Sequence, residues 1–307
     1  MTDNIYARST GPLRLTPSFV CFADILGYKE RSQEAIRTGQ GMEFLNRLRD
    51  ALSRAHERLR EHSEPIGLTP FYSIKIFTDN IVVGYPLHPG YSNYGEPELG
   101  DILLTFAELQ ATLAADGFFI RGGIAYGDHY MDEDIVFGEA LLQVVKLNQS
   151  GGLPRLVLAP SAVEIIREHL GFYAFIEDAP HYWHLFQDAD GAVFVNYLSE
   201  AFCGFPDGIS FDLIEAHQRA VIRGLQDYRA KPDIRAKFEW ADRYHNFVCH
   251  EFVRNHPVPT HPDVDEGYAL ATQEAQRVLD FIIDVESLAA TPSTLSITPT
   301  WKRLGQG

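Results

Sequence analysis

The sequence predicts an α+β fold in which an antiparallel-rich sheet packs under two helices and a helical appendage follows. Two observations carry this prediction. Up to about residue 197, short apolar segments typical of strands alternate with segments of helical periodicity, in the order strand, helices, hairpin, helix, strand. This order is a β-α-β-β-α-β arrangement. From Phe211 onward the strand signals stop, and helical segments follow one another.

The first part of the chain shows both periodicities. A strand is expected at about residues 18–24, and residues 29–62 carry apolar residues at helical spacing. Gly39–Gly41 is expected to break this second segment into a short helix and a long one. Residues 71–85 are expected to form a hairpin that turns at Thr78–Asn80, because Asp and Asn tolerate the geometry of a turn.

The remaining elements are recognised by the same two patterns. Before residue 150 we expect a helix at about 97–115, a strand at 118–126, a polar hairpin at 127–134, the short strand 136–138 and a helix at 139–148. The sheet is expected to continue with strands near 156–158, 172–176, 183–186 and 193–197, with a helix at 162–169. The later helical segments are 211–230, 233–254 and 266–289.

These elements divide the chain into four parts. Residues 1–17 are expected to form an irregular N-terminal arm, residues 18–205 the sheet domain, residues 206–289 the helical appendage and residues 290–307 a loose tail. We expect the appendage to pack on the sheet domain or on a partner subunit and not to be a second catalytic domain.

The composition excludes several classes of function. Of the 307 residues 45% are hydrophobic and 22% are charged, which is typical of a globular protein. The net charge of −16 argues against a dedicated nucleic-acid binder. No apolar stretch approaches the ~20 residues that span a bilayer. The three cysteines lie in no metal-ligand spacing, so we expect a soluble protein of the reducing cytoplasm.

Two aspartates interrupt segments that are otherwise typical of buried strands. Asp24 follows the apolar run 18–22, and Asp79 lies between two alternating apolar stretches. An ionised carboxylate in such a place is costly unless it is paired. If the two side chains converge at one end of neighbouring strands, they and the backbone carbonyl of Ile25 offer hard oxygen ligands for Mg²⁺ or Mn²⁺. The alternative is that both are turn and capping residues.

The chain resembles the class III nucleotidyl cyclases in four stretches that occur in the order of that family. These stretches are Phe22–Tyr28, Lys75–Asp79, Arg121–Gly127 and Phe137–Gly138. The resemblance covers residues 18–200 and implies a ferredoxin-like catalytic domain that pairs head to tail with a second copy, each active site taking residues from both. It also implies that Asp24 and Asp79, helped by the Ile25 carbonyl, bind two Mn²⁺ or Mg²⁺ ions.

The resemblance implies roles for other side chains as well. Arg121 matches the arginine that contacts the triphosphate, and a guanidinium grips phosphate oxygens bidentately. Lys75 falls where adenylyl cyclases place a lysine that reads the base. Because an ammonium only donates hydrogen bonds, it suits an acceptor such as adenine N1 or uracil O4.

The helix after Gly138 departs from the purine cyclases. Where those enzymes carry an Asn and an Arg, this chain has Leu142 and Lys146, and their base-reading Asp falls on Ile135. Lys146 can still neutralise charge that develops at the α-phosphate. The second phosphate-binding lysine of the family has no clear counterpart.

Within the family, four runs look like the stand-alone pyrimidine cyclases of bacterial anti-phage (Pycsar) systems: Phe22–Gly27, Thr78–Val82, Arg121–Gly127 and Ile135–Leu141. This resemblance implies that a homodimer converts UTP or CTP to a 3′,5′-cyclic monophosphate and pyrophosphate, and that a separate effector binds the product. The donor-only Lys75 and the absence of a matching Asp favour UTP, and thus cyclic UMP as the product. Phe22, Phe77 and Tyr126 are candidate walls of a narrowed base pocket. The alternatives are a cytidylate or adenylate cyclase, and a degenerate cyclase-like module that only binds a nucleotide.

Overall fold

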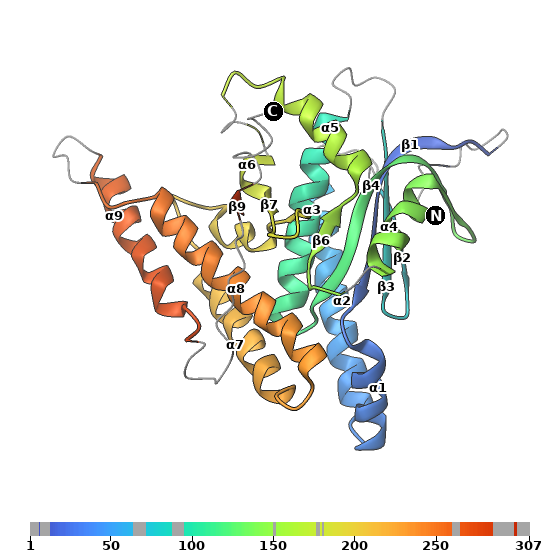
Figure 1. The fold of residues 1–307 in the computed structure, drawn as a ribbon, viewed down its shortest axis with the longest axis horizontal. Coiled ribbons are helices and arrows are strands. Elements are labelled where there is room, and N and C mark those ends of the chain that lie inside the picture. The colour runs from blue at the N-terminus through green and yellow to red at the C-terminus, as the bar shows by residue number, and fades with distance from the viewer. Residues whose placement is uncertain are drawn as a thin grey trace.

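A computed structural model describes residues 6, 13–63, 72–87, 95–149, 152–175, 179, 181–259, 265–284 and 298–299 (Figure 1). Within these residues the strands join in one sheet, with the order β2-β3-β1-β4-β6-β8-β7-β9, and β5 pairs with β4. The strands are β1 (Thr16–Ile25), β2 (Ser73–Phe77), β3 (Asn80–Pro86), β4 (Ile120–Met131), β5 (Val136–Gly138), β6 (Leu156–Leu158), β7 (Leu185–Gln187), β8 (Val193–Val195) and β9 (Thr298–Pro299).

The pairing is antiparallel except between β4 and β6, which run parallel. The expected α+β fold, with an antiparallel-rich sheet and a helical C-terminal region, is therefore confirmed. The helices before the C-terminal region are α1 (Tyr28–Arg37), α2 (Gly41–Ser63), α3 (Glu96–Ala115), α4 (Glu139–Gln149), α5 (Pro160–Leu170) and α6 (His181–His184). The later ones are α7 (Phe211–Asp227), α8 (Pro232–Asn255) and α9 (Glu266–Ala275), with 3₁₀ segments η2 (Tyr197–Phe202) and η3 (Gln276–Phe281).

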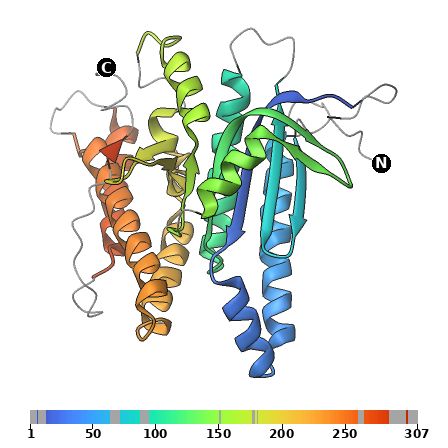
Figure 2. The ribbon, with the colours of Figure 1, turned by 45° about the vertical axis from the view of Figure 1, so that its right-hand side comes forward.

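Helices pack on both faces of the first part of the sheet, and on one face α4 packs on β1 and β4. Because successive residues of a strand point to opposite sides, Phe19 and Cys21 face the core that holds α2 and α3, while Val20 and Phe22 face α4. Figure 2 shows α4 in front of these strands and α2 behind them. This α4 face of the sheet, which carries the even-numbered residues of β1, is the one that matters for the site.

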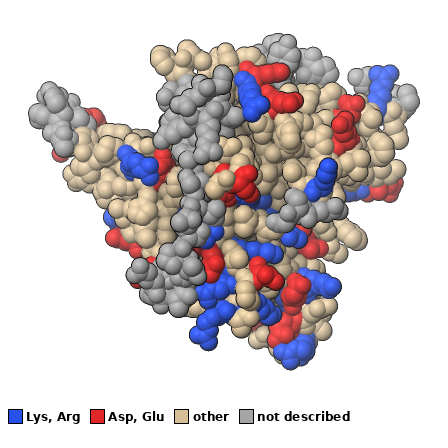
Figure 3. All heavy atoms as spheres, viewed as in Figure 1, with Lys and Arg blue, Asp and Glu red and all other residues tan. Residues whose placement is uncertain are grey.

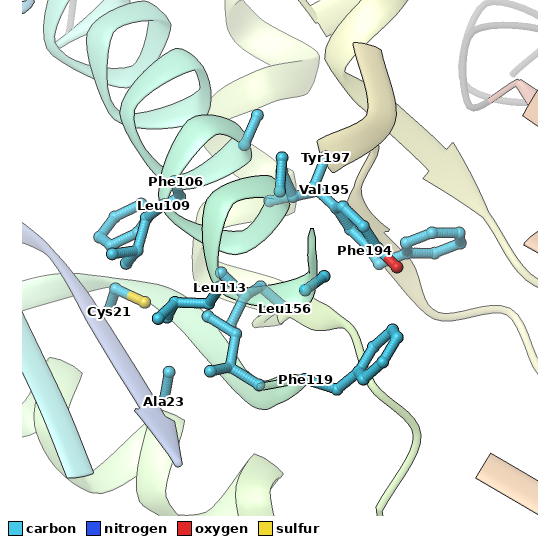
Figure 4. Packing of buried hydrophobic residues seen from close by; sticks show 14 of the residues in the cluster. Cys21, Ala23, Phe106, Leu109, Leu113, Phe119, Leu156, Phe194, Val195 and Tyr197 are labelled. Carbon is cyan, nitrogen blue, oxygen red and sulfur yellow. The ribbon is translucent and has the colours of Figure 1, made fainter. Parts of the chain in front are cut away.

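Helix α3 is the centre of the core. Its residues Phe106, Leu109 and Leu113 are buried, and Figure 4 shows them between β1 on one side and the segment of β8 and η2 on the other. The same core continues through Phe194 to Trp240 and Tyr244 of α8. Sheet and C-terminal helices therefore share one hydrophobic core in the part of the chain that the structure describes.

Polar contacts join α8 to the far half of the sheet. The guanidinium of Arg155, just before β6, forms a buried ion pair with Asp188, and the indole Nε1 of Trp240 donates a 2.7 Å hydrogen bond to the same carboxylate. The Tyr244 hydroxyl donates to Asn196 Oδ1 at 2.7 Å and accepts from the backbone N–H of Leu198 at 2.8 Å. These buried bonds set the position of α8 against the sheet.

Several boundaries differ from those expected from the sequence. Strand β4 continues to Met131, through residues expected to form a polar hairpin, because it pairs with β1 on one side and β5 beyond it. Residues 172–175 form turns and bends, not the expected strand, and residues 183–184 belong to α6. The last helical segment ends as the 3₁₀ helix η3 at Phe281, and the expected helical residues 285–289 lie outside the described ones.

The two ends of the chain are described only in part. Residues 298–299, expected within a loose tail, form β9 and pair with β7. Of the expected N-terminal arm, residues 1–5 and 7–12 lie outside the described residues. No helix among the described residues is long and apolar enough to span a membrane.

Leu113 should contribute strongly to stability, because its side chain is fully buried in the core on α3. We expect Leu113→Ala to lower the free energy of unfolding by about 2–5 kcal/mol, from lost burial and the cavity that remains. Leu45→Ala on α2, where the leucine is 52% exposed, is the matched control and should cost less than about 0.5 kcal/mol. Urea titration followed by circular dichroism measures both. Equal losses in the two variants would contradict the assignment of α3 to the core.

Candidate nucleotide-binding site

Asp24 lies one residue before the end of β1, with only 8% of its surface exposed. The register of the sheet places it directly opposite Arg121 of β4. Arg121 donates from Nε to Oδ1 at 2.8 Å and from Nη2 to Oδ2 at 3.2 Å, so the guanidinium grips the carboxylate bidentately. The two charges expected from the sequence to bind metal and phosphate therefore neutralise each other in this structure.

Asn148, near the end of α4, is a third member of this site and was not anticipated from the sequence. Its Nδ2 donates to Asp24 Oδ2 at 2.7 Å. The available signal was its position: Ala140 and Val144 are buried on α4, and Asn148 continues that stripe at a spacing of four residues. A polar residue on a buried helical stripe usually has a polar partner.

A glycine lets α4 approach closely enough for this contact. A Cβ at Gly123 would lie 2.9 Å from the Val157 carbonyl oxygen and 3.0 Å from Leu147 Cδ1. Gly123 therefore permits the tight packing of α4 and β6 around β4, and this packing brings the end of α4 to Asp24.

Asp79 lies in the tight turn between β2 and β3, next to the end of β1. The backbone N–H of Ile25 donates to the Asp79 carbonyl at 3.0 Å, which ties the turn to the strand that carries Asp24. Thr78 takes a left-handed conformation with φ of 56°, and its hydroxyl donates to Asp79 Oδ1 at 2.8 Å. The structure thus places both candidate metal ligands at one end of the sheet, and their role as ligands stays a prediction.

The donor set around Asp24 and Asp79 fits a hard divalent cation. Carboxylate and carbonyl oxygens are the donors that Mg²⁺ and Mn²⁺ prefer, and two carboxylates leave coordination positions for phosphate oxygens and water. The described residues contain no group of three or more His, Cys, Asp or Glu side chains that could hold a metal. A cation at Asp24 would compete with Arg121 and Asn148 for the carboxylate.

Leu142 and Lys146 share the outer face of α4. They are four residues apart and both exposed, Leu142 by 71%. Lys146 and Asn148 are two residues apart, which corresponds to roughly 200° around the helix axis. Because Asn148 faces Asp24, the side chain of Lys146 projects away from the Asp24 of its own chain.

Lys75 and Phe22 lie on the same face of the sheet as Asp24. In the register, Lys75 is opposite Val82, and Val82 is opposite Phe22. Spacings within a sheet put the Cα of Lys75 roughly 12 Å from that of Asp24, so Lys75 does not reach it within one chain. Phe77, at 76% exposure, belongs to this face as well.

Tyr126 is on the other face, and its prediction as a wall of the same pocket is wrong. It is opposite Phe19 in the register, and the two rings pack with centroids 5.2 Å apart. Residues at odd positions of β1 face α2 and α3, so the sheet separates Tyr126 from Phe22.

Ile135 ends the turn between β4 and β5, where its side chain is 50% exposed. The turn is held by Asp132, whose Oδ1 accepts from the backbone N–H of Ile135 at 2.7 Å and of Asp134 at 2.9 Å. The hydrogen bond from Tyr130, these two backbone bonds and the charge of Lys75 lower the pKa of Asp132. Ile135 contacts no other candidate residue through a described interaction, and its role stays a prediction.

A groove of about 870 Å³ leads from Arg121 along α1 and α2 on one side and α7 and α8 on the other. Eight Lys and Arg residues and six Asp and Glu residues line it, so it is net positive in a chain whose net charge is −16. Figure 3 shows blue Lys and Arg atoms gathered with red ones over the lower part of the molecule, between α7 and α1. The N-terminus of α1, which begins after Gly27 without a side-chain cap, also borders the groove.

Comparisons with known proteins give structural likenesses only. No family model matches the chain, and no curated protein matches it. Among solved structures, the adenylyl cyclase CyaB from P. aeruginosa matches with a TM-score of 0.41 and 12% identity over 59% of this chain and 93% of that one. The guanylyl cyclase Cya2 matches with a TM-score of 0.34 and 11% identity, over 49% and 78% of the two chains.

A third solved structure is a class III adenylyl cyclase-like ATP-binding protein from Pseudomonas aeruginosa. It matches with a TM-score of 0.30 and 12% identity, over 49% of this chain and 35% of that one. Because all three TM-scores are below 0.5, the functional conclusion rests on the residues of the site and not on these likenesses.

The ion pair at the site should stabilise the ligand-free protein. We expect Arg121→Gln to lower the free energy of unfolding by about 1–3 kcal/mol, because it leaves the carboxylate of Asp24 nearly buried without its charged partner. Urea titration without divalent metal measures the change.

The matched control is Arg54→Gln. Arg54 pairs with Asp116 at 2.6 Å on the surface, with 52% of its side chain exposed, so this variant should lose less than about 1 kcal/mol. A loss in Arg54→Gln as large as that in Arg121→Gln would show that the pair at the site has no special role in stability.

Proposed function

We propose that this protein is a metal-dependent nucleotide cyclase that converts UTP to 3′,5′-cyclic UMP and pyrophosphate. The observation that carries the proposal is the meeting of Asp24, Asp79 and Arg121 at one end of the sheet, with Arg121 already bound to a carboxylate in bidentate geometry. Phosphate oxygens offer a guanidinium the same geometry. The resemblance of the four sequence stretches to class III nucleotidyl cyclases supports the same reaction.

In the proposed reaction, Asp24, Asp79 and the Ile25 carbonyl would hold two Mn²⁺ or Mg²⁺ ions. Divalent cations in such a site lower the pKa of a hydroxyl and offset the charge of phosphates. The 3′-hydroxyl would lose its proton to water, its oxygen would form a bond to the α-phosphorus, and the bond from that phosphorus to the bridging oxygen would break. Pyrophosphate leaves with the electron pair of that bond.

Arg121 and Lys146 are the catalytic cations of the proposal. Arg121 exchanges the carboxylate of Asp24 for β- or γ-phosphate oxygens when the triphosphate binds. Lys146 stabilises the charge that develops at the α-phosphate, as a point charge without a bidentate fork. Because Lys146 projects away from its own Asp24, it would act in the site of a second copy.

The base would be held by Lys75 between apolar side chains. Lys75 donates a hydrogen bond to uracil O4, and Phe22 and Ile135 limit the pocket to a pyrimidine. Because its ammonium only donates hydrogen bonds, Lys75 does not by itself recognise the amino group of cytosine, which favours UTP over CTP. An adenylate cyclase is the alternative that Lys75 also permits.

A second copy of the chain would complete the site. Exposed apolar side chains lie on the α4 face around Lys75 and Lys146. Contact between such a group of apolar side chains and water is unfavourable. They are Phe77 at 76% exposure, Phe137 at 61%, Leu142 at 71% and Ile135 at 50%. A homodimer through this surface would bring Lys75 and Lys146 of one chain to Asp24 and Asp79 of the other.

In the cell, we propose that the product acts as a second messenger in anti-phage defence. A cytoplasmic cyclase would respond to infection, and a separate effector would bind the cyclic nucleotide. The support for this part is the resemblance of the Arg121–Gly127 and Ile135–Leu141 runs to the Pycsar cyclases.

A degenerate module that binds a nucleotide without turnover is the second candidate. It is favoured by one observation: three hydrogen bonds from Arg121 and Asn148 occupy the carboxylate of Asp24. Binding of UTP with metal in a thermal-shift assay, without formation of product, would support this candidate.

Purified protein with Mn²⁺ and each of the four nucleoside triphosphates should yield cyclic UMP as the main product, read out by mass. Asp79→Ala should reduce turnover at least about 100-fold, because a ligand of the cation is lost, while the melting temperature stays close to that of the wild type. The matched control is Asp280→Ala, an exposed aspartate of η3, which should retain full turnover. Product from ATP alone would overturn the pyrimidine assignment.

A mixture of Asp79→Ala and Lys146→Ala chains should recover activity. In a mixed dimer, one site takes its aspartates from the Lys146→Ala chain and its lysine from the Asp79→Ala chain, so that site is intact. About half of the dimers in an equimolar mixture are mixed and have one working site of two, so roughly a quarter of wild-type turnover is expected.

The control mixture combines Asp79→Ala with Asp24→Ala chains. In those mixed dimers each site lacks an aspartate, so no recovery is expected. If the first mixture is as inactive as the control, the site is not shared between chains.

A further inference from the structure

Lys237, a residue of the C-terminal helix α8, lies beside the candidate site. It lies on the second turn of α8, and it lines the groove that also holds Arg121. A Cβ at Gly152 would lie 3.4 Å from Lys237 Nζ and 3.4 Å from Arg121 Nη1. The two cationic groups are therefore less than about 7 Å apart, on either side of the same glycine. Gly152 has a φ of 74°, so a side chain there would be strained as well as crowded.

No described residue neutralises Lys237 by direct contact. Arg121 is paired with Asp24, whereas Lys237 takes part in no ion pair or hydrogen bond among the described side chains. Partial burial lowers the pKa of Lys237 and the positive charge of Arg121 lowers it further, while the more distant Asp24, Glu30 and Asp233 act in the opposite direction. Asp24 compensates Arg121 but not Lys237 by direct contact, so an anion that reaches both side chains would be stabilised by the uncompensated charge of Lys237.

The groove beyond Lys237 is suited to an extended anion. From α7, α8 and the turn between them, it is lined by the basic residues Arg219, Arg223, Lys231 and Lys237 and by one acid, Asp227. Basic residues therefore outnumber acids on this side of the groove. A chain of phosphates that starts at Arg121 would meet Lys237 next.

We propose that Lys237 binds the terminal phosphates of the nucleoside triphosphate together with Arg121 of the same chain. The C-terminal helices are then part of the substrate site, and Lys237 is a substrate-binding residue that holds the leaving pyrophosphate group. The identity of the ligand rests on the proposed function. The existence of a polyphosphate site between β4 and α8 rests on the placement of Lys237, Arg121 and Gly152.

The experiment measures binding of inorganic tripolyphosphate by isothermal titration calorimetry, with the full chain and Mn²⁺ present. We expect Lys237→Gln to weaken binding about 10- to 100-fold, the effect of losing one charged hydrogen bond to phosphate. Lys237→Arg keeps the charge and should bind within about threefold of the wild type. Thermal melting shows whether each variant is folded.

The matched control is Lys231→Gln. Lys231 precedes α8, is exposed, and lies six residues before Lys237, so its removal changes the net charge of the groove by the same amount. Its effect should stay below about threefold, because screening weakens a charge that does not touch the ligand. Equal losses in Lys231→Gln and Lys237→Gln would overturn the proposal, because they would reflect only the general field of the groove.

A turnover assay distinguishes the phosphate-binding role of Lys237 from the proposed cyclase activity. If UTP is cyclised, Lys237→Gln should raise KM about 10-fold or more, and affinity for UMP, which lacks the terminal phosphates, should not change. Cyclisation with an unchanged KM in Lys237→Gln would overturn the inference and leave the proposed function intact. If no nucleotide is cyclised but tripolyphosphate binding still depends on Lys237, the polyphosphate site stands and the proposed function fails.

Discussion

The burial of α3 is the constraint on which the arrangement of this molecule depends. Leu109 and Leu113 on this helix lie against the first strands, and the same core continues through Phe194 to Trp240 on α8. A helix that is apolar around most of its circumference is stable only when other elements cover it on every side. The sheet and α2 supply part of this cover, and the segments around η2 and α7 supply the rest. The C-terminal helices are thereby held in a defined position relative to β4, and this position puts Lys237 beside Arg121.

The two faces of the sheet have different tasks because side chains alternate along β1. One face holds the core with α3, while the other carries Phe22 and Asp24 toward α4. At the end of the strand the apolar pattern gives way to a charge, and the structure compensates that charge with Arg121 and Asn148. In the proposed reaction, Asp24 keeps these two partners only until substrate and metal bind. A cation and a triphosphate together would replace both partners, because the cation satisfies the carboxylate and the phosphates satisfy the guanidinium. Asp24 and Arg121, which pair in the free protein, would then be free to bind the cation and the phosphates at the same time.

Much of the fold could be predicted because its elements have strong local signals. The break at Gly39–Gly41 and the hairpin turn at Thr78–Asp79 were expected, and both occur in the structure. The wrong predictions are those that depend on which strands lie next to each other in the sheet. Residues 172–175 have the apolar and aromatic composition of a strand but no neighbouring strand to pair with in the described structure, and β4 extends to Met131 because β5 pairs with it. Tyr126 was assigned to the wrong side of the sheet because the register of β4 against β1 was not known.

The sequence by itself determined the order of strands and helices up to α5, the two aspartates at the ends of apolar segments, and the arginine in the third motif. These are local properties, since periodicity and turn chemistry act over a few residues. Only the tertiary structure decided that Arg121 and Asn148, 97 and 124 residues away in the chain, hydrogen-bond to Asp24. It also decided that Lys237 from a helix expected to be an appendage lies in the same groove. No pattern in the sequence predicts such contacts, because they follow from how α3 and α4 pack on the sheet, and packing depends on the shape of the whole core.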